Sequence, residues 1–155
     1  FDHLVQRLKF NNALAVGRAL LPDWSAALRA HLSTREAPPA QALIPIPLHR
    51  ARLRQRGYNQ ALELARDLGG ELNLPVLPAA LQRVRATAPM PGLDLTTRRR
   101  NVRGAFAVST KTALPGRVAL VDDVMTSGAT LNEAAKVLKR AGVAWVEVWV
   151  LSRKP

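Results

Sequence analysis

Short apolar runs and stretches with apolar residues at helical spacing follow one another along the chain. The apolar runs are typical of buried strands and lie at 42–46, 75–81, 103–108, 118–121 and 143–151. Helical spacing predicts helices over 2–21, 23–32, 58–68 and 131–141, with glycines after the last two. Strands that alternate with helices predict an α/β protein with a mainly parallel sheet flanked by helices.

The stretch 118–130, VALVDDVMTSGAT, joins one of these strands to a helix. Asp122 and Asp123 follow the apolar run, and a loop of small and hydroxyl residues comes next. In open parallel sheets, ligands bind beyond the carboxyl ends of the strands, and the N-terminus of a helix attracts anions. Carboxylates bind sugar hydroxyls or a phosphate-bound Mg²⁺. The stretch therefore predicts a site for a sugar phosphate.

Other interpretations of this stretch remain open from the residues alone. It could be an ordinary turn between a strand and a helix, with a Ser or Thr as the N-cap. A nucleotidase of the P-loop type would need a G-x-x-x-x-G-K-[ST] loop, which the sequence lacks. A receiver-type acidic pocket would take its acids from separate strands.

Beyond this pattern, the stretch resembles the phosphoribosyl pyrophosphate (PRPP) motif of type I phosphoribosyltransferases. Within that superfamily the chain resembles the ComF family, which is associated with competence and DNA uptake in bacteria. Three more stretches carry this resemblance: the opening FDHLVQRLKFNN, IPIPLHRARLRQRGYNQ at 44–60 and RRRNVRGAF at 98–106. The resemblance implies one phosphoribosyltransferase-like domain over 1–155, with a helical hood at 1–40 and a core at 41–155.

The resemblance also implies roles for individual residues. Asp122 and Asp123 would be catalytic, would accept hydrogen bonds from the ribose hydroxyls and would contact Mg²⁺ only through PRPP. The 5′-phosphate would lie in the loop of Thr126, Ser127, Gly128, Ala129 and Thr130. Pyrophosphate would be held after the first core strand, often through a strained or cis peptide, by Pro47, Leu48, His49, Arg50 and Arg56. A flexible loop would close over PRPP and include Arg83, Arg85, Thr87, Met90, Arg99 and Asn101. ComF-type chains mostly have Gln where Met90 stands.

Four arginines alternate at 50, 52, 54 and 56 without an intervening acid. A strand would align them on one face, whereas a helix would scatter them. Because like charges this dense repel one another, a bound anion would stabilise them. The alternative is a solvated basic turn, and for His49 it is a structural hydrogen bond.

Basic residues dominate the charge: 23 Lys and Arg stand against 11 Asp and Glu, for a net charge of +12. Arg provides 18 of the 23, which favours phosphate recognition, although a genome rich in G and C would also favour Arg. High positive charge is also typical of nucleic-acid binding.

Two functions are therefore compared. The first is an enzyme that transfers phosphoribose from PRPP to an unidentified acceptor. The second is a non-catalytic PRPP-binding adaptor that carries single-stranded DNA beside the DNA-uptake machinery. PRPP sensing without turnover lies between them. Trp145 and Trp149 are expected to pack against helices, with base stacking as the alternative.

Location is predicted from what the sequence lacks. No apolar run reaches the roughly 18 residues of a membrane span, and the start has no signal-peptide pattern, so we expect a cytoplasmic protein without membrane insertion. The chain opens on Phe1, which suggests a fragment. ComF relatives usually carry an upstream Cys-rich segment thought to bind zinc. This chain has no cysteine to support such a site or a disulfide.

Overall fold

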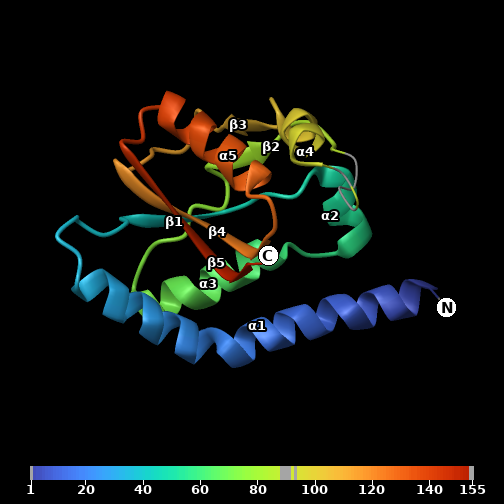
Figure 1. The fold of residues 1–155 in the computed structure, drawn as a ribbon, viewed down its shortest axis with the longest axis horizontal. Helices are drawn as coiled ribbons and strands as arrows, with labels where there is room; N and C mark the ends of the chain where they lie inside the picture. Colours follow the sequence, from blue (N-terminus) through green and yellow to red (C-terminus); the bar gives the residue numbers. More distant parts are fainter. Residues whose placement is uncertain (1, 88–91, 93, 154–155) are drawn as a thin grey trace.

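A three-stranded parallel sheet forms the centre of the structure, in the order β1-β4-β5. The computed structural model describes residues 2–87, 92 and 94–153, and their side chains from residue 14 onward. The strands are β1 (Ala42–Pro45), β4 (Arg117–Met125) and β5 (Trp145–Arg153), and helices cover both faces of the sheet (Figure 1). This architecture confirms the predicted α/β class with a parallel sheet flanked by helices.

The central strand β4 is longer than its apolar run. Its partner β1 ends where Pro45 lies opposite Val121, but β5 continues alongside β4 until Arg153 lies opposite Met125. The prediction that the strand ends at Val121 was wrong, because pairing with β5 keeps the following residues extended. Asp122 and Asp123 therefore lie inside the strand, just past the end of β1.

Side chains of β4 point alternately into two cores. Val118 and Leu120 pack on the side of α5 (Ala129–Arg140) and the antiparallel pair β2 (Leu81–Arg83) and β3 (Phe106–Val108). Ala119 and Val121 pack on the side of α3 (Gln60–Leu72). All four are buried, so the strand separates the two cores completely.

The N-terminal helix is present as predicted, but as one element rather than two. α1 runs from Asp2 to Ser33 with Pro22 inside it, and the Ser25 hydroxyl donates a hydrogen bond of 3.0 Å to the Pro22 carbonyl. In Figure 1 its N-terminal part extends beyond the rest of the molecule. Its second half packs on the α3 core through Leu21, Trp24, Leu28 and Leu32. A hood role for residues 1–40 stays a prediction.

Gly69 lies inside α3, although the sequence placed the end of a helix there. The helix continues to Leu72 and ends at Asn73, which adopts φ 54°. A Cβ on Gly69 would lie 2.8 Å from the Leu74 carbonyl oxygen and 2.9 Å from Val76 Cγ2, so glycine allows this close approach. Val76 makes a single bridge to Leu43 of β1, whereas the predicted strand over 75–81 is displaced to β2.

Two further helices, α2 (Arg50–Arg56) and α4 (Leu95–Val102), lie toward the same end of the molecule in Figure 1. The His49 side chain caps α2 by accepting a hydrogen bond of 3.3 Å from the Ala51 N–H. The basic run is thus helical, and i, i+4 spacing separates the pair Arg52 and Arg56 from the pair Arg50 and Arg54. No described peptide bond is cis, so of the two alternatives given for the loop after β1, a strained or a cis peptide, the cis form does not occur there. Among the described helices, none has the length and apolar character needed to cross a membrane.

Candidate functional site

The two adjacent carboxylates of β4 define the candidate site. Asp122 and Asp123 are both partly buried, and strand alternation directs them to opposite faces of the sheet. Asp122 Oδ1 accepts a hydrogen bond of 3.0 Å from the Asp123 N–H, and Asp123 Oδ1 accepts one of 2.8 Å from the Val124 N–H. Each carboxylate is therefore oriented by the residue that follows it.

Asp122 lies on the face of β2 and β3, where the charge of Arg83 acts on its pKa. Burial raises the pKa of Asp122 to about 8, the charge of Asp123 adds to this effect, and Arg83 opposes it. The pKa of Arg83 is lowered by burial and by Arg52, whereas Asp122 raises it. Asp122, Arg83 and Arg52 thus interact across the end of the sheet.

The Arg83 side chain is held in place by its surroundings. Its guanidinium carbon lies 5.4 Å from the centroid of the Phe106 ring, and Nη2 donates a hydrogen bond of 2.5 Å to the Thr87 hydroxyl. Its Nε is buried and has no hydrogen-bond partner among the described residues. A donor left in this state favours binding of an additional acceptor.

Asp123 faces Arg56 and Tyr58 on the opposite side. Burial lowers the pKa of Arg56 and neighbouring Arg52 lowers it further, whereas Asp123 raises it. Burial raises the pKa of Tyr58, with Arg56 opposing and Asp123 reinforcing that shift. The Asn59 amide donates a hydrogen bond of 3.0 Å to the Ile46 carbonyl. This bond fixes the start of α3, and hence Tyr58, against the end of β1.

The loop predicted to hold the 5′-phosphate connects β4 directly to α5. The N-cap of α5 is Gly128 with φ 72°, and no side chain makes a capping hydrogen bond to this helix. The Ser127 hydroxyl accepts only a long hydrogen bond of 3.4 Å from the Ala129 N–H. A turn with a Ser or Thr at the N-cap is therefore not what forms here. Apart from this long bond, the N–H groups at the start of the helix remain suited to an anion.

Residues of the predicted pyrophosphate and flexible loops are only partly brought to the acids. Arg56 and Arg83 lie near the acids. Arg50, by contrast, is exposed on the other side of α2, and Arg99 is exposed on α4. Arg85 Nη2 donates hydrogen bonds of 2.8 Å and 2.5 Å to the carbonyls of Asn101 and Arg103, and so holds the end of α4. Met90 lies outside the described residues.

Arg52 and Tyr58 were not singled out from the sequence: the basic run as a whole was expected to bind an anion, and the helix that opens at Tyr58 was expected to turn its polar start toward the site. Arg52 was recognised only as part of the basic run, and its helical spacing to Arg56 was the signal that would have selected it. Tyr58 carries no such signal, because the turn at Gly57, with φ 84°, decides where it lies.

The described side chains do not form a metal site of their own, so Mg²⁺ would have to arrive bound to a phosphorylated ligand. No described group of three or more His, Cys, Asp or Glu side chains could hold a metal ion. Mg²⁺ typically keeps one or two carboxylates and takes its other ligands from substrate phosphates and water. Asp122 and Asp123 lie on opposite faces of β4 and do not form such a ligand pair by themselves, so contact with Mg²⁺ through a phosphorylated ligand stays a prediction.

These features define a class: a parallel α/β protein whose candidate ligand site lies near the carboxyl end of its central strand, with carboxylates, arginines and a glycine turn. The relatives identify the family. Competence protein F of Haemophilus influenzae is 41% identical over 152 residues, and DNA utilization protein YhgH of Escherichia coli K12 is 36% identical over 155 residues; each match covers 97% of this chain and 66% of that protein. Competence protein ComFC of Streptococcus pneumoniae is 29% identical over 110 residues, or 71% of this chain and 47% of that protein. The chain belongs to this ComF family of competence-related proteins.

Two further comparisons complete this picture. The chain spans about two thirds of the length of the curated relatives it matches first, 66% in each case. No protein-family model matches it. Among solved structures, adenine phosphoribosyltransferase from Leishmania tarentolae has a TM-score of 0.49 and 14% identity, over 83% of this chain and 53% of that chain.

Proposed function

We propose that the end of β4 binds PRPP together with Mg²⁺. The observation that supports this most directly is the order of chemistry along 122–130: two carboxylates, then a positive-φ glycine, then the uncapped start of α5. Arginines on both faces complement the acids. Carboxylates that can accept hydrogen bonds from sugar hydroxyls lie beside an anion site, as the binding of a sugar phosphate requires. The surrounding arginines would bind its pyrophosphate group.

In this proposal each part of the site has a defined task. Asp122 and Asp123 accept hydrogen bonds from the ribose 2′- and 3′-hydroxyls, and the N–H groups of the 126–130 loop hold the 5′-phosphate. Arg52, Arg56 and Arg83 would bind the pyrophosphate, and the Mg²⁺ that accompanies PRPP would supply further positive charge there. The protein would then promote displacement at the ribose C1 by positioning and charge stabilisation, without a covalent nucleophile.

Thermal unfolding with Mg²⁺ and PRPP tests binding. PRPP should raise the melting temperature of the parent protein and of Asp23→Asn, a control at an exposed aspartate of α1. Asp123→Asn should remove that increase, because the negative charge is lost and one of the two acceptor oxygens becomes an NH₂ donor. Undiminished stabilisation of Asp123→Asn would remove the assignment of PRPP to this site.

The cellular role follows the relatives, whose names refer to competence and DNA utilization. We propose that the chain serves DNA uptake as a phosphoribosyltransferase with an unidentified acceptor. Pyrophosphate release measured with a panel of bases and nucleosides tests this activity. Release with one acceptor, lost in Asp123→Asn, supports transfer, whereas PRPP binding without release under any acceptor favours a non-catalytic protein.

A second function, an adaptor for single-stranded DNA, is favoured by one observation. Arginines of α2, α4 and the residue after α4 are exposed toward one end of the molecule: Arg50, Arg52, Arg54, Arg99, Arg100 and Arg103. Phosphate binding by such a surface should weaken steeply with salt. Replacing Arg50, Arg54 and Arg99 by Ala should reduce the affinity for oligothymidine, whereas Lys136, Lys139 and Arg140→Ala on α5 is the matched control. An affinity that ignores salt would exclude this role.

A further inference from the structure

β5 is an outer strand of the sheet and pairs only with β4. It is 9 residues long, beyond the roughly 5–6 residues of a typical strand. In the described part of the chain, no main-chain group of 146–153 makes a hydrogen bond on the side away from β4. Outer strands are usually protected by Pro, Lys or a bulge. From Trp145 to Leu151, β5 has neither Pro nor Lys, and Val148 is 41% exposed.

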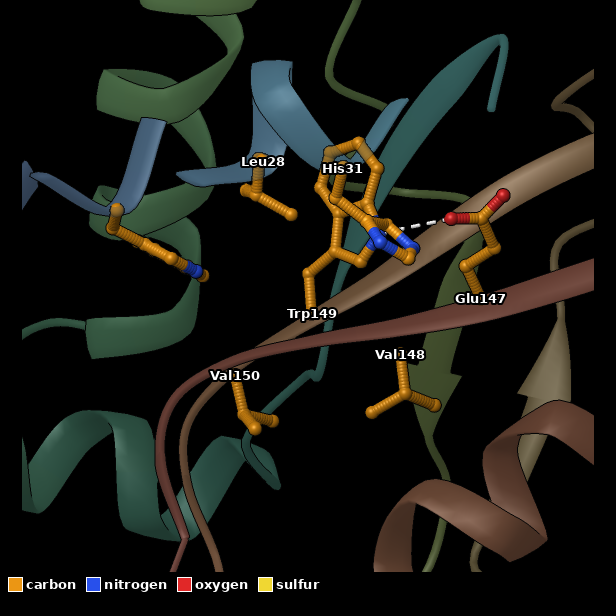
Figure 2. A pocket seen from close by; sticks show the side chains of 7 residues that line it. Leu28, His31, Glu147, Val148, Trp149 and Val150 are labelled. Carbon is orange, nitrogen blue, oxygen red and sulfur yellow. Dashed lines mark hydrogen bonds between the residues drawn. The ribbon is translucent and has the colours of Figure 1, made fainter. Parts of the chain in front are cut away.

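A cavity of about 250 Å³ lies between α1 and this strand, away from the carboxylates of β4. Figure 2 shows Leu28, His31, Glu147 and Trp149 on one side of β5, and Val148 and Val150 on the other. Residues from both faces of β5 therefore contribute to the lining of the cavity. Its volume falls below the roughly 300–1,000 Å³ of small-molecule pockets and suits a single large side chain.

Two ionisable side chains, His31 of α1 and Glu147 of β5, line this cavity. The Glu147 side chain is only 9% exposed, and its Oε2 accepts hydrogen bonds from Arg35 Nη1 at 2.8 Å and Trp149 Nε1 at 3.0 Å. Its other oxygen, Oε1, is buried and has no partner within the described structure. A carboxylate oxygen left unpaired favours an additional N–H donor, most of all a cationic one.

We propose that the β5 edge binds an extended peptide segment of a partner protein, which adds a strand to the sheet. The main chain of the peptide would pair with β5. One apolar side chain would enter the cavity beside Trp149, and a Lys or Arg two positions away would approach Glu147, because residues two apart share a face. A second copy of this chain is disfavoured as the occupant, since two chains of net charge +12 repel each other.

Labelled nine-residue peptides test this proposal by fluorescence anisotropy. The first probe is rich in Thr and carries one Leu and one Lys, placed two positions apart; we call it the Lys probe. The second, the Glu probe, has Glu in place of that Lys. We expect the Lys probe to bind about tenfold more tightly than the Glu probe. Equal affinity for the two probes, or no binding of either, would overturn the proposal.

Variants of the protein locate the binding surface. Val148→Lys adds a charge at the strand edge and should weaken binding of the Lys probe by about tenfold. Val84→Lys makes the same change at a valine that is 56% exposed elsewhere and should leave binding intact. Thermal unfolding checks that both variants fold. Equal effects of the two variants would place the peptide elsewhere.

Two more measurements separate other occupants and the PRPP site. Sedimentation that showed a dimer, dissociated by Val148→Lys, would make a second copy the occupant and overturn the proposal of a foreign peptide. Asp123→Asn should leave peptide affinity unchanged. The peptide site therefore stands or falls independently of the PRPP site.

Discussion

Asp122 and Asp123 are chemically identical neighbours, yet the two faces of β4 give them different surroundings. Asp122 turns toward the β2–β3 side, where burial raises its pKa to about 8 and Arg83 opposes the rise. Asp123 turns toward α2 and α3, where it acts on the ionisation of Arg56 and Tyr58. A strand that separates two cores thus converts a repeated residue into two distinct groups.

The difference has a consequence for ligand binding. A carboxyl group with a pKa near 8 is largely protonated at neutral pH and can donate as well as accept a hydrogen bond. Its neighbour stands beside Arg56 and Tyr58. One ribose hydroxyl would then meet a group that titrates near neutrality while the other meets a carboxylate beside a cation.

The largest expected effect is the pH dependence of stability caused by Asp122. Its folded pKa is raised, so the folded state holds a proton that the unfolded state releases from about pH 4 upward. Stability contributed by this proton should fall as pH rises from about 4 to about 8, by an amount on the order of a few kcal/mol. Asp122→Asn should flatten this part of the profile measured by urea unfolding. A profile that Asp122→Asn leaves unchanged would contradict the contrast between the faces.

A smaller effect is expected at Gly128, the turn that follows both acids. Its φ of 72° costs a residue with a Cβ about 1–2 kcal/mol, while the new Cβ would meet only Met125 at 3.6 Å. Gly128→Ala should therefore destabilise the protein equally at pH 5 and pH 8. Gly70→Ala, which meets no atom within 4 Å and lies in α3, is the control and should be neutral or stabilising. If Gly128→Ala lost more stability at one pH than at the other, the turn would be affecting the ionisation of one of the two aspartates rather than both faces equally.

The smallest effect should separate the two arginines. Arg83→Met removes the cation that lowers the pKa of Asp122, so the midpoint of the pH profile should move upward. Arg56 is influenced by Asp123 instead, so Arg56→Met should leave the midpoint of the pH profile unchanged. The measurement is the same urea titration across pH. Equal shifts in both variants would mean that the faces are not electrostatically separate.

Much of the fold could be predicted because apolar periodicity reports directly on burial. The α/β class and the turn at Gly142 follow from local patterns. Element ends were less predictable, since they depend on partners distant in sequence. β4 extends to Met125 because β5 does, and α3 passes through Gly69 because Leu74 and Val76 need a close approach.

The Trp residues of β5 illustrate the same limit within the predicted core. Trp149 is buried at 5% exposure, as packing predicted, but Trp145 is 46% exposed and lies 5.8 Å from the Arg117 guanidinium. Both belong to one alternating face in sequence. Only the position of α1, which covers one end of that face, separates them.

The sequence by itself determined the acids, the glycine turn and the basic run, because these are short-range patterns of residue type and spacing. Tertiary structure alone decided which arginines meet which carboxylate, since Arg56 and Arg83 reach neighbouring residues from elements on opposite sides of the sheet. It also decided that β5 keeps a free edge beside a cavity, because strand order and the placement of α1 arise from long-range packing.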